Sequence, residues 1–267
     1  MEVLREATMV RCFPKGLSAD DLATLGTLGS VLPALERLIL IEPAAGPDGM
    51  QRLFEKLGAG ALPAVTRLFL NCMHVGGAGA SALAAALGRG AMPRLKELTL
   101  INAAIGDAGL VALAPALRRL PALEHIGLND NPFGDEGLAA LVAPPPPPAG
   151  ALPPPTGVLA KLKDLDLSYT QVTDAGCAAL AAALDSGALP ALEVLDLTGT
   201  LASEAEAAAL MARFPGDSDS DDAVASDDSH SDASYAAAVA SDDSHSDVSY
   251  AAAVASDDSH SDASYVE

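Results

Sequence analysis

The side chains that could carry out chemistry are few, and most of the histidines lie in one repeated segment. The motif SDDSHSD occurs three times near the C-terminus and supplies His230, His245 and His260. Imidazole and carboxylate groups bind metals, so each copy is a candidate metal site. Each copy offers only one histidine beside flexible carboxylates, however, and a solvated repeat is the favoured interpretation. We therefore predict no metal site and no cofactor.

No combination of residues predicts catalysis. The sequence contains no P-loop, nucleophile elbow or zinc-binding spacing. Cys72 and Cys177 fall inside repeating units, where a small buried side chain is expected. The third cysteine, Cys12, forms no C-x-x-C pair with either, and a sparse odd set favours a reducing compartment. We predict a protein that is not an enzyme.

Three serines are candidates for modification. Ser229, Ser244 and Ser259 each precede an aspartate by three residues, a pattern that resembles sites of acid-directed kinases such as casein kinase 2. Each phosphate would add about −1.5 to −2 charges. The alternative interpretation is an unmodified, solubilising tail.

The residues that could bind a partner are positioned by a repeating element, and Leu123–Leu141 is its clearest copy. Its first residues have the spacing L-x-x-L-x-L of a short strand. Asn131 follows, where a buried amide can bond the neighbouring turn. Phe133 closes the turn, and a helix is expected to begin near Gly134.

Six clean copies of this unit can be traced. Their first strand positions are separated by intervals of 30, 30, 28, 39 and 30 residues. The strand positions are Leu35/Leu38/Leu40, Val65/Leu68/Leu70, Leu95/Leu98/Leu100, Leu123/Ile126/Leu128, Leu162/Leu165/Leu167 and Leu192/Leu195/Leu197. Such regular self-similarity is typical of a stacked array. A worn seventh copy precedes them, with Leu4, Ala7 and Met9 at strand positions and Cys12 at the turn.

Recurring residues also predict the helix ends. Glycine repeats near the helix start, at Gly49, Gly79, Gly109, Gly137 and Gly176. Because glycine weakens a helix by about 1 kcal/mol, its recurrence indicates a close approach of helix to strand layer. Asp107, Asp135 and Asp174 are expected to cap their own helices. Prolines between helix and strand should end each helix and extend the residue before them.

Residues 1–214 resemble leucine-rich repeat proteins of the ribonuclease-inhibitor type. The resemblance rests on the matched intervals and strand motifs, and departs from the family in having only one asparagine, Asn131, at the turn position. It implies an α/β fold: a right-handed solenoid, or horseshoe, of about seven repeats, with a parallel sheet on the concave face and helices on the convex face.

The predicted organisation has three parts. Residues 1–31 form a degenerate N-terminal repeat, and residues 32–214 form the solenoid with a proline-rich insertion at about 143–157. Residues 215–267 contain three 15-residue Ser/Asp-rich repeats and should be disordered. The insertion segment Pro144–Pro148 is expected to be extended and resembles profilin-binding segments, which bind a proline-recognising domain. The alternative is a tolerated loop.

Charge restricts the partners. The net charge is −21, and residues 215–267 hold 14 of the 36 acidic residues and no lysine or arginine. Such a chain repels nucleic acid and anionic membranes and suits a basic protein at its tail. We expect no membrane span, because no apolar stretch is long enough. With no apolar N-terminal run either, we expect a cytoplasmic or nuclear protein.

The concave face can be predicted because strand side chains alternate. Its N-terminal half should present basic and apolar residues, and its C-terminal half acidic residues. Apolar residues that gather on an exposed sheet indicate an interaction patch, although single exposed apolar residues are ordinary. The predicted binding residues are Arg37, Ile39, Ile41, Arg67, Phe69, Asn71, Ile101, Asn129, Asp164, Asp166, Tyr169 and Asp196.

The favoured function is a non-enzymatic scaffold for protein–protein interaction, with a partner on the concave face. Two alternatives come from other classes. Proteins of the RanGAP type, which activate a small GTPase, combine similar repeats with an acidic tail, but their catalytic motif cannot be matched here. A histone-binding or chaperone-like protein would rest on the acidic tail alone, which resembles that of the acidic leucine-rich nuclear phosphoproteins.

Overall fold

Seven parallel strands alternate with seven helices in the part of the chain that the computed structural model describes, residues 6–12, 17–41, 46–142 and 159–214. The strands are β1 (Met9–Cys12), β2 (Arg37–Ile41), β3 (Arg67–Asn71), β4 (Glu97–Ile101), β5 (His125–Gly127), β6 (Asp164–Asp166) and β7 (Val194–Asp196). The helices are α2 (Ala19–Leu28), α3 (Gly46–Lys56), α4 (Gly76–Gly88), α5 (Asp107–Leu117), α6 (Asp135–Val142), α7 (Asp174–Asp185) and α8 (Glu204–Met211).

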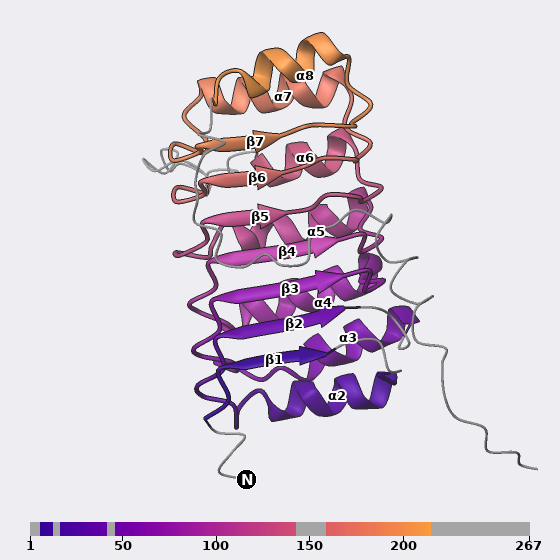
Figure 1. Ribbon diagram of the computed structural model, residues 1–267, viewed down its shortest axis with the longest axis vertical. Coiled ribbons are helices and arrows are strands. Elements are labelled where there is room, and N and C mark those ends of the chain that lie inside the picture. Colours follow the sequence, from indigo (N-terminus) through magenta and orange to yellow (C-terminus); the bar gives the residue numbers. More distant parts are fainter. Residues whose placement is uncertain (1–5, 13–16, 42–45, 143–158, 215–267) are drawn as a thin grey trace, which may run out of the picture. The chain divides into compact units, whose positions relative to one another are not determined.

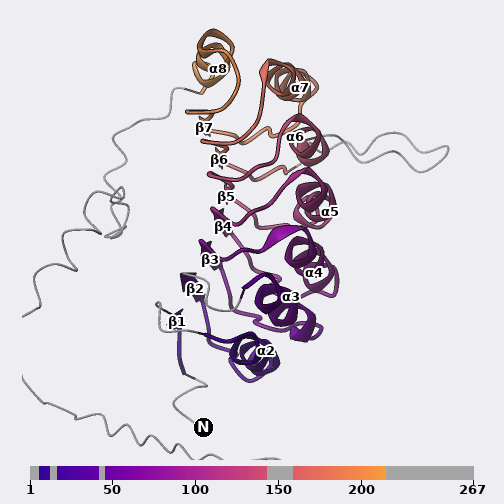
Figure 2. The same cartoon turned by 90° about the vertical axis from the view of Figure 1, so that its right-hand side faces the viewer.

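The strands form one sheet in chain order, β1 to β7 (Figure 1). Figure 2 shows the sheet as one layer and the helices as a second layer beside it. Each strand–helix unit therefore packs against its neighbours in sequence, which is the architecture of a solenoid. This confirms the predicted α/β class. The sheet surface turned away from the helices is called the open sheet face below.

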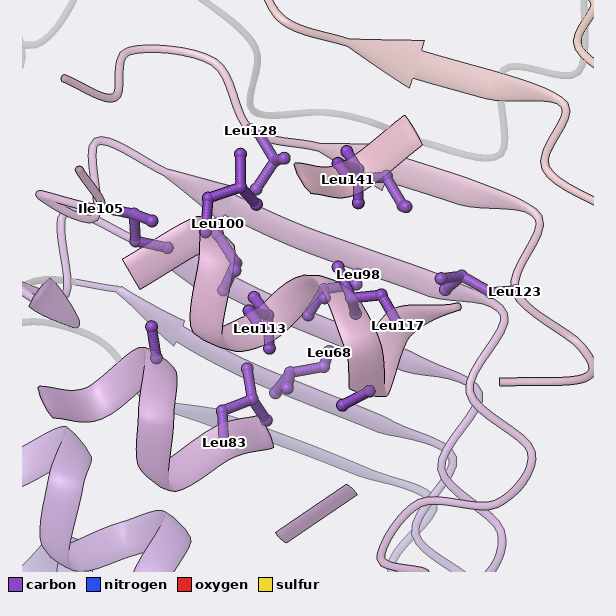
Figure 3. Close-up of a cluster of buried hydrophobic side chains, with 14 of the residues drawn as sticks. Leu68, Leu83, Leu98, Leu100, Ile105, Leu113, Leu117, Leu123, Leu128 and Leu141 are labelled. Atoms are coloured by element: carbon purple, nitrogen blue, oxygen red, sulfur yellow. The ribbon is translucent and has the colours of Figure 1, made fainter. Parts of the chain in front are cut away.

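The leucines of the strand motif build the core. In β4, Leu98 and Leu100 point toward the helices and are fully buried, while the alternating residues Glu97, Thr99 and Ile101 face the other side. Figure 3 shows how they pack against Leu113 and Leu117 of α5. Each fully buried leucine contributes about 1.5–3 kcal/mol. One such layer per unit, continued through the stack, compensates for the scarcity of aromatic residues.

Asn131 links two units, as predicted. Its Nδ2 group donates to the carbonyl oxygens of Leu100, Leu128 and Asn129 at 2.7, 2.9 and 3.1 Å. Its Oδ1 accepts from the amides of Ala103 and Ile105 at 3.1 and 3.0 Å. The buried amide therefore satisfies five backbone groups across the turns after β4 and β5.

The first unit has a different register from the one predicted. Val10 pairs with Leu38 and Cys12 with Leu40, so Cys12 is a core strand position rather than a turn residue. The strand motif in this unit is Ala7, Val10 and Cys12, not Leu4, Ala7 and Met9. These small side chains give a weak pattern, and the more hydrophobic Leu4 and Met9 suggested the wrong register.

The repeated aspartates do not cap their own helices. Asp107, Asp135 and Asp174 are the first residues of α5, α6 and α7, respectively. Each carboxylate accepts at least one hydrogen bond from the following unit. Asp107 Oδ1 accepts from the amides of Gly134 and Gly137 at 2.8 and 2.7 Å. Asp135 Oδ1 accepts from the Thr173 amide at 2.8 Å, and Asp174 Oδ1 from the Ser203 amide at 2.6 Å. Each aspartate therefore bonds the start of the helix in the following repeat instead of its own.

The recurring glycines make room for these aspartates and for the preceding helix, not for the strand layer as predicted. A Cβ on Gly137 would lie 2.9 Å from Asp107 Oδ1. A Cβ on Gly176 would clash with Asp135 Oδ1 and lie 2.8 Å from Val172 Cγ1.

Leu62, Met92 and Leu189 precede prolines and have φ values of 53°, 50° and 54°, so they are left-handed rather than extended. All three side chains are buried. Their burial offsets the cost of about 1–2 kcal/mol for a left-handed non-glycine residue. The prolines follow the helix ends by several residues and so shape the turn rather than the helix end.

Several predictions concern residues outside the described ranges. They are the insertion with Pro144–Pro148, and the tail with its histidines and with Ser229, Ser244 and Ser259. None of the described helices is long and apolar enough to span a membrane.

Candidate binding surface

The strand pairing places the predicted residues in rows across the open sheet face. One row runs Met9, Arg37, Arg67, Glu97, His125, Asp164 and Val194 from β1 to β7. The next row runs Arg11, Ile39, Phe69, Thr99, Gly127, Asp166 and Asp196. Ile41, Asn71 and Ile101 begin a third row, in which Asn129 follows β5. Eleven of the twelve predicted residues thus share this face, and Tyr169 lies in the turn after β6.

The N-terminal half of the face is less basic than its residues suggest. Arg67 Nε lies 2.9 Å from Glu97 Oε2, so this arginine is paired across strands β3 and β4. Arg37 is exposed, and no ion pair joins it to another described residue. Ile39 and Phe69 are register partners, whereas Asn71 separates Ile41 from Ile101. All four apolar residues are half-buried, so only part of each side chain is accessible to a ligand.

The middle of the open sheet face has a glycine, Gly127, and a titratable residue, His125, on β5. Thr99 lies over Gly127, where a Cβ would be 3.2 Å from Thr99 Cγ2. His125 Nδ1 lies 3.6 Å from Asp164 Oδ2. The adjacent Asp164 carboxylate is the main cause that raises the pKa of His125; partial burial opposes this, and the charges of Glu97 and Glu124 add to it. The imidazole therefore joins the central strands to the acidic end.

The C-terminal half of the face is acidic. Asp166 and Asp196 are register partners on β6 and β7, and Asp164 lies two residues before Asp166. Asp166 Oδ1 accepts from the Ser168 amide at 2.9 Å and from the Ser168 hydroxyl at 2.6 Å. Asp196 Oδ1 accepts from the Thr198 amide at 2.8 Å. Burial raises the pKa of Asp166, the Ser168 bonds oppose this, and the charges of Asp196 and Asp164 raise the pKa further.

Tyr169 stands at the rim of this acidic half. Tyr169 is 60% exposed, which makes it the second most exposed large hydrophobic residue among those described. Its backbone is left-handed, with φ 55°, and its amide donates to the Thr198 carbonyl at 2.8 Å. The ring packs on Gly199, because a Cβ there would lie 2.6 Å from Tyr169 Cδ1 and Cε1. The aromatic face is therefore held in place by the adjacent turn.

Among the described residues, no group of three or more histidine, cysteine, aspartate or glutamate side chains is placed to bind a metal ion. Cys177 is buried in α7, as predicted, and burial raises the pKa of its thiol. Cys72 is half-buried, and its Sγ is 3.2 Å from Asn71 Oδ1.

Two features of the surface were not foreseen from the sequence. One is the pairing of Arg67 with Glu97, which their opposite charges at matched register positions could have suggested. The other is the support of Tyr169 by Gly199. A glycine at the position equivalent to Tyr169 in the next repeat is the sequence feature that corresponds to it.

Comparison with known families agrees with this architecture. A family model described as Leucine Rich repeat matches residues 121–142 and 158–181. The fold is an α/β leucine-rich repeat solenoid. The two matched segments contain β5 and α6, and β6 with most of α7, and the same unit recurs along the whole described sheet. The matches support a leucine-rich repeat protein, while the ribonuclease-inhibitor type stays a prediction. No curated protein matched the chain.

Proposed function

We propose that this leucine-rich repeat chain is a non-enzymatic scaffold that binds a protein partner on its open sheet face. The observation that carries the proposal is the arrangement of that face. The described helices pack on the other side of the sheet, so the rows of side chains project from a surface that no described helix covers. Solenoids commonly use such extended surfaces for recognition.

The dimensions of the face suit a protein ligand better than a small molecule. Adjacent strands lie about 4.8 Å apart, so seven strands span roughly 30 Å. Half-buried apolar side chains lie at one end and carboxylates at the other, with Phe69 and Asp166 as examples. A partner that covers both ends gains apolar contact and charge complementarity together.

The test is affinity capture with the full chain and two matched double variants. Arg37→Glu with Phe69→Ala changes the open sheet face. Arg119→Glu with Val111→Ala makes the same kinds of change on exposed residues of α5 and the turn after it. We expect the first variant to recover a specific partner at least tenfold less than the wild type and the second to recover it equally. Equal recovery by all three proteins would exclude the face.

The acidic tail is a separate part of the proposal. Residues 215–267 would engage a basic protein, with Ser229, Ser244 and Ser259 as phosphorylation sites that deepen the charge. Phosphopeptide mapping tests the three serines, and capture with and without residues 215–267 tests the tail as a recognition element. Identical partner lists would show that the tail selects nothing.

The insertion is also proposed as a ligand. Pro144–Pro148 would bind a proline-recognising domain, as polyproline segments do. Titration of purified profilin with the full chain and with a variant in which these five prolines are alanines tests this. Binding that is unchanged by the substitution would show that the segment is only a loop.

A further inference from the structure

Charge is balanced at one end of the open sheet face and unbalanced at the other. On β3 and β4, Arg67 is paired with Glu97. On β5 to β7, the described face carries Asp164, Asp166 and Asp196 and no lysine or arginine. Lys163 and Arg213, two cations near this end, are paired with acids outside these rows.

Lys163, the residue before Asp164, has its Nζ 3.9 Å from Glu193 Oε1. Arg213 lies 2.7 Å from Asp185 Oδ1, between the last helices. On the described rows of β5 to β7, His125 offers partial compensation, at 3.6 Å from Asp164. The rows of β5 to β7 on the described face therefore contain no lysine or arginine that balances the three carboxylates.

The carboxylates are also pre-positioned. Asp166 and Asp196 each use Oδ1 to accept the amide of the residue two positions on. In the described part of the chain, no hydrogen bond is made by the Oδ2 atom of either residue. The turns thus fix both carboxylates while leaving one oxygen of each for a ligand, which lowers the ordering cost of binding.

Tyr169 adds a feature that points to the same ligand. Its ring is exposed at the rim of β6 and β7 and supported by Gly199. Aromatic faces attract guanidinium and ammonium groups, and arginine both stacks on such a face and forms paired hydrogen bonds with carboxylates. Val194, which is 41% exposed beside Asp164, offers apolar contact to the stem of such a side chain.

We propose that the β5–β7 end of the open sheet face binds an arginine-rich segment of the protein partner, with guanidinium groups on Asp166 and Asp196 and on the ring of Tyr169. This inference rests on the proposed function and names the chemistry of the partner. It also fixes the partner's orientation, because the exposed Arg37 at the other end repels a cationic segment.

The experiment uses full-length protein and a fluorescein-labelled nine-residue peptide that alternates glycine and arginine. The control peptide replaces each arginine with citrulline, which keeps the shape and removes the charge. Fluorescence anisotropy gives the affinity. We expect the arginine peptide to bind at least tenfold more tightly than the citrulline peptide and to weaken as salt is raised.

Variants of the face then locate the binding. Asp166→Asn with Asp196→Asn keeps an Oδ1 acceptor for each turn and should weaken binding at least fivefold. Tyr169→Ala should weaken it two- to fivefold, while Tyr169→Phe should bind as the wild type does. The matched control is Glu136→Gln with Glu204→Gln, two exposed acids on helices α6 and α8, which should change nothing.

The acidic tail is present in every variant, so its attraction for the peptide is constant. Unchanged affinity in Asp166→Asn/Asp196→Asn, or an equal loss in the helix control, would overturn the inference, because the peptide would then bind the tail or the general negative field. Self-association that is lost in the same variant would instead identify a second copy as the occupant and would also overturn it. Thermal unfolding of each variant shows whether it is folded.

The capture experiment separates this inference from the proposed function. If the partner depends on Arg37 and Phe69 but not on Asp166 and Asp196, the scaffold function stands and the arginine-rich segment is excluded. If neither pair matters, the open sheet face is not the binding surface and both proposals fail.

Discussion

At the scale of single residues, Asn131 makes more side-chain hydrogen bonds than any other residue for which the described structure gives them. It is 2% exposed and makes five hydrogen bonds to backbone groups of two units. The equivalent residues Thr170 and Thr200 each donate only to a carbonyl of their own turn, Leu167 and Leu197. The Asn131 amide therefore joins the units of β4 and β5, which a threonine with one hydroxyl group cannot do.

Replacing Asn131 with alanine should cost about 3–4 kcal/mol in the free energy of unfolding, because it leaves buried amides and carbonyls without partners. Thr200→Ala should cost about 1 kcal/mol, since one hydrogen bond is lost. Urea unfolding followed by circular dichroism measures both. Similar losses in the two variants would contradict the role of Asn131 as the link.

His125 should make stability depend on pH. Its pKa is raised above 6.5, chiefly by the adjacent Asp164 carboxylate. A raised pKa in the folded state means that the stabilisation is complete below the unfolded-state pKa and is lost as pH rises through the folded-state pKa. The difference in unfolding free energy between wild type and His125→Gln should therefore be largest below about pH 6.5 and fall at higher pH.

Urea unfolding between pH 5 and pH 9 checks this dependence. The control is the same substitution in an Asp164→Asn background, where the main cause of the shift is absent. There the difference between histidine and glutamine should vary much less with pH. A pH dependence of equal size in both backgrounds would show that Asp164 is not the partner that matters.

At the scale of elements, the helices are joined through their ends. Aspartates at the start of one helix bond the start of the next, as Asp107 and Asp135 show. At the other end, Arg89 after α4 donates to the Phe54 and Leu57 carbonyls of the preceding unit at 3.0 Å. Negative groups at helix starts and positive groups at helix ends also suit the helix dipole.

Two glycines in equivalent helices should respond oppositely to alanine. Gly176→Ala places a Cβ against Asp135 Oδ1 and Val172, and should destabilise by about 1–3 kcal/mol. Gly77→Ala in α4 meets nothing within 4 Å and should stabilise by about 0.5–1 kcal/mol. Thermal unfolding of the two variants measures the difference. A stabilising Gly176→Ala would show that the contact with Asp135 is not a constraint.

At the scale of the whole solenoid, the features that repeat from unit to unit could be predicted from the sequence. Leucines at Leu98 and Leu100 gave the strand faces because side chains alternate, and the repeat interval aligned each strand with the next. The rows of the open sheet face followed from these two regularities. Interactions between units did not follow, because a carboxylate such as Asp135 is equally compatible with capping its own helix or the next. That choice depends on distances between units.

The ends of the array differ from its centre. Among the described strands, β7 is the last of the sheet, and Met211 of α8 covers its edge, with Sδ accepting from the Leu197 amide at 3.3 Å. Sulfur is a weak acceptor, so this end is held less firmly than an interior strand. Figure 2 shows α8 displaced from the helix row toward β7, which fits a role in covering the exposed edge.

This difference predicts where each core substitution acts. Leu113 in α5 and Leu210 in α8 are both buried leucines. Because each unit contacts only its neighbours, Leu210→Ala should raise amide hydrogen exchange in β7 and α8 alone, while Leu113→Ala should cost about 2–5 kcal/mol and raise exchange in the units on both sides. Hydrogen-exchange mass spectrometry of the full chain distinguishes the patterns. If Leu210→Ala raised exchange as far as β2, the array would unfold as one cooperative unit rather than by nearest-neighbour coupling.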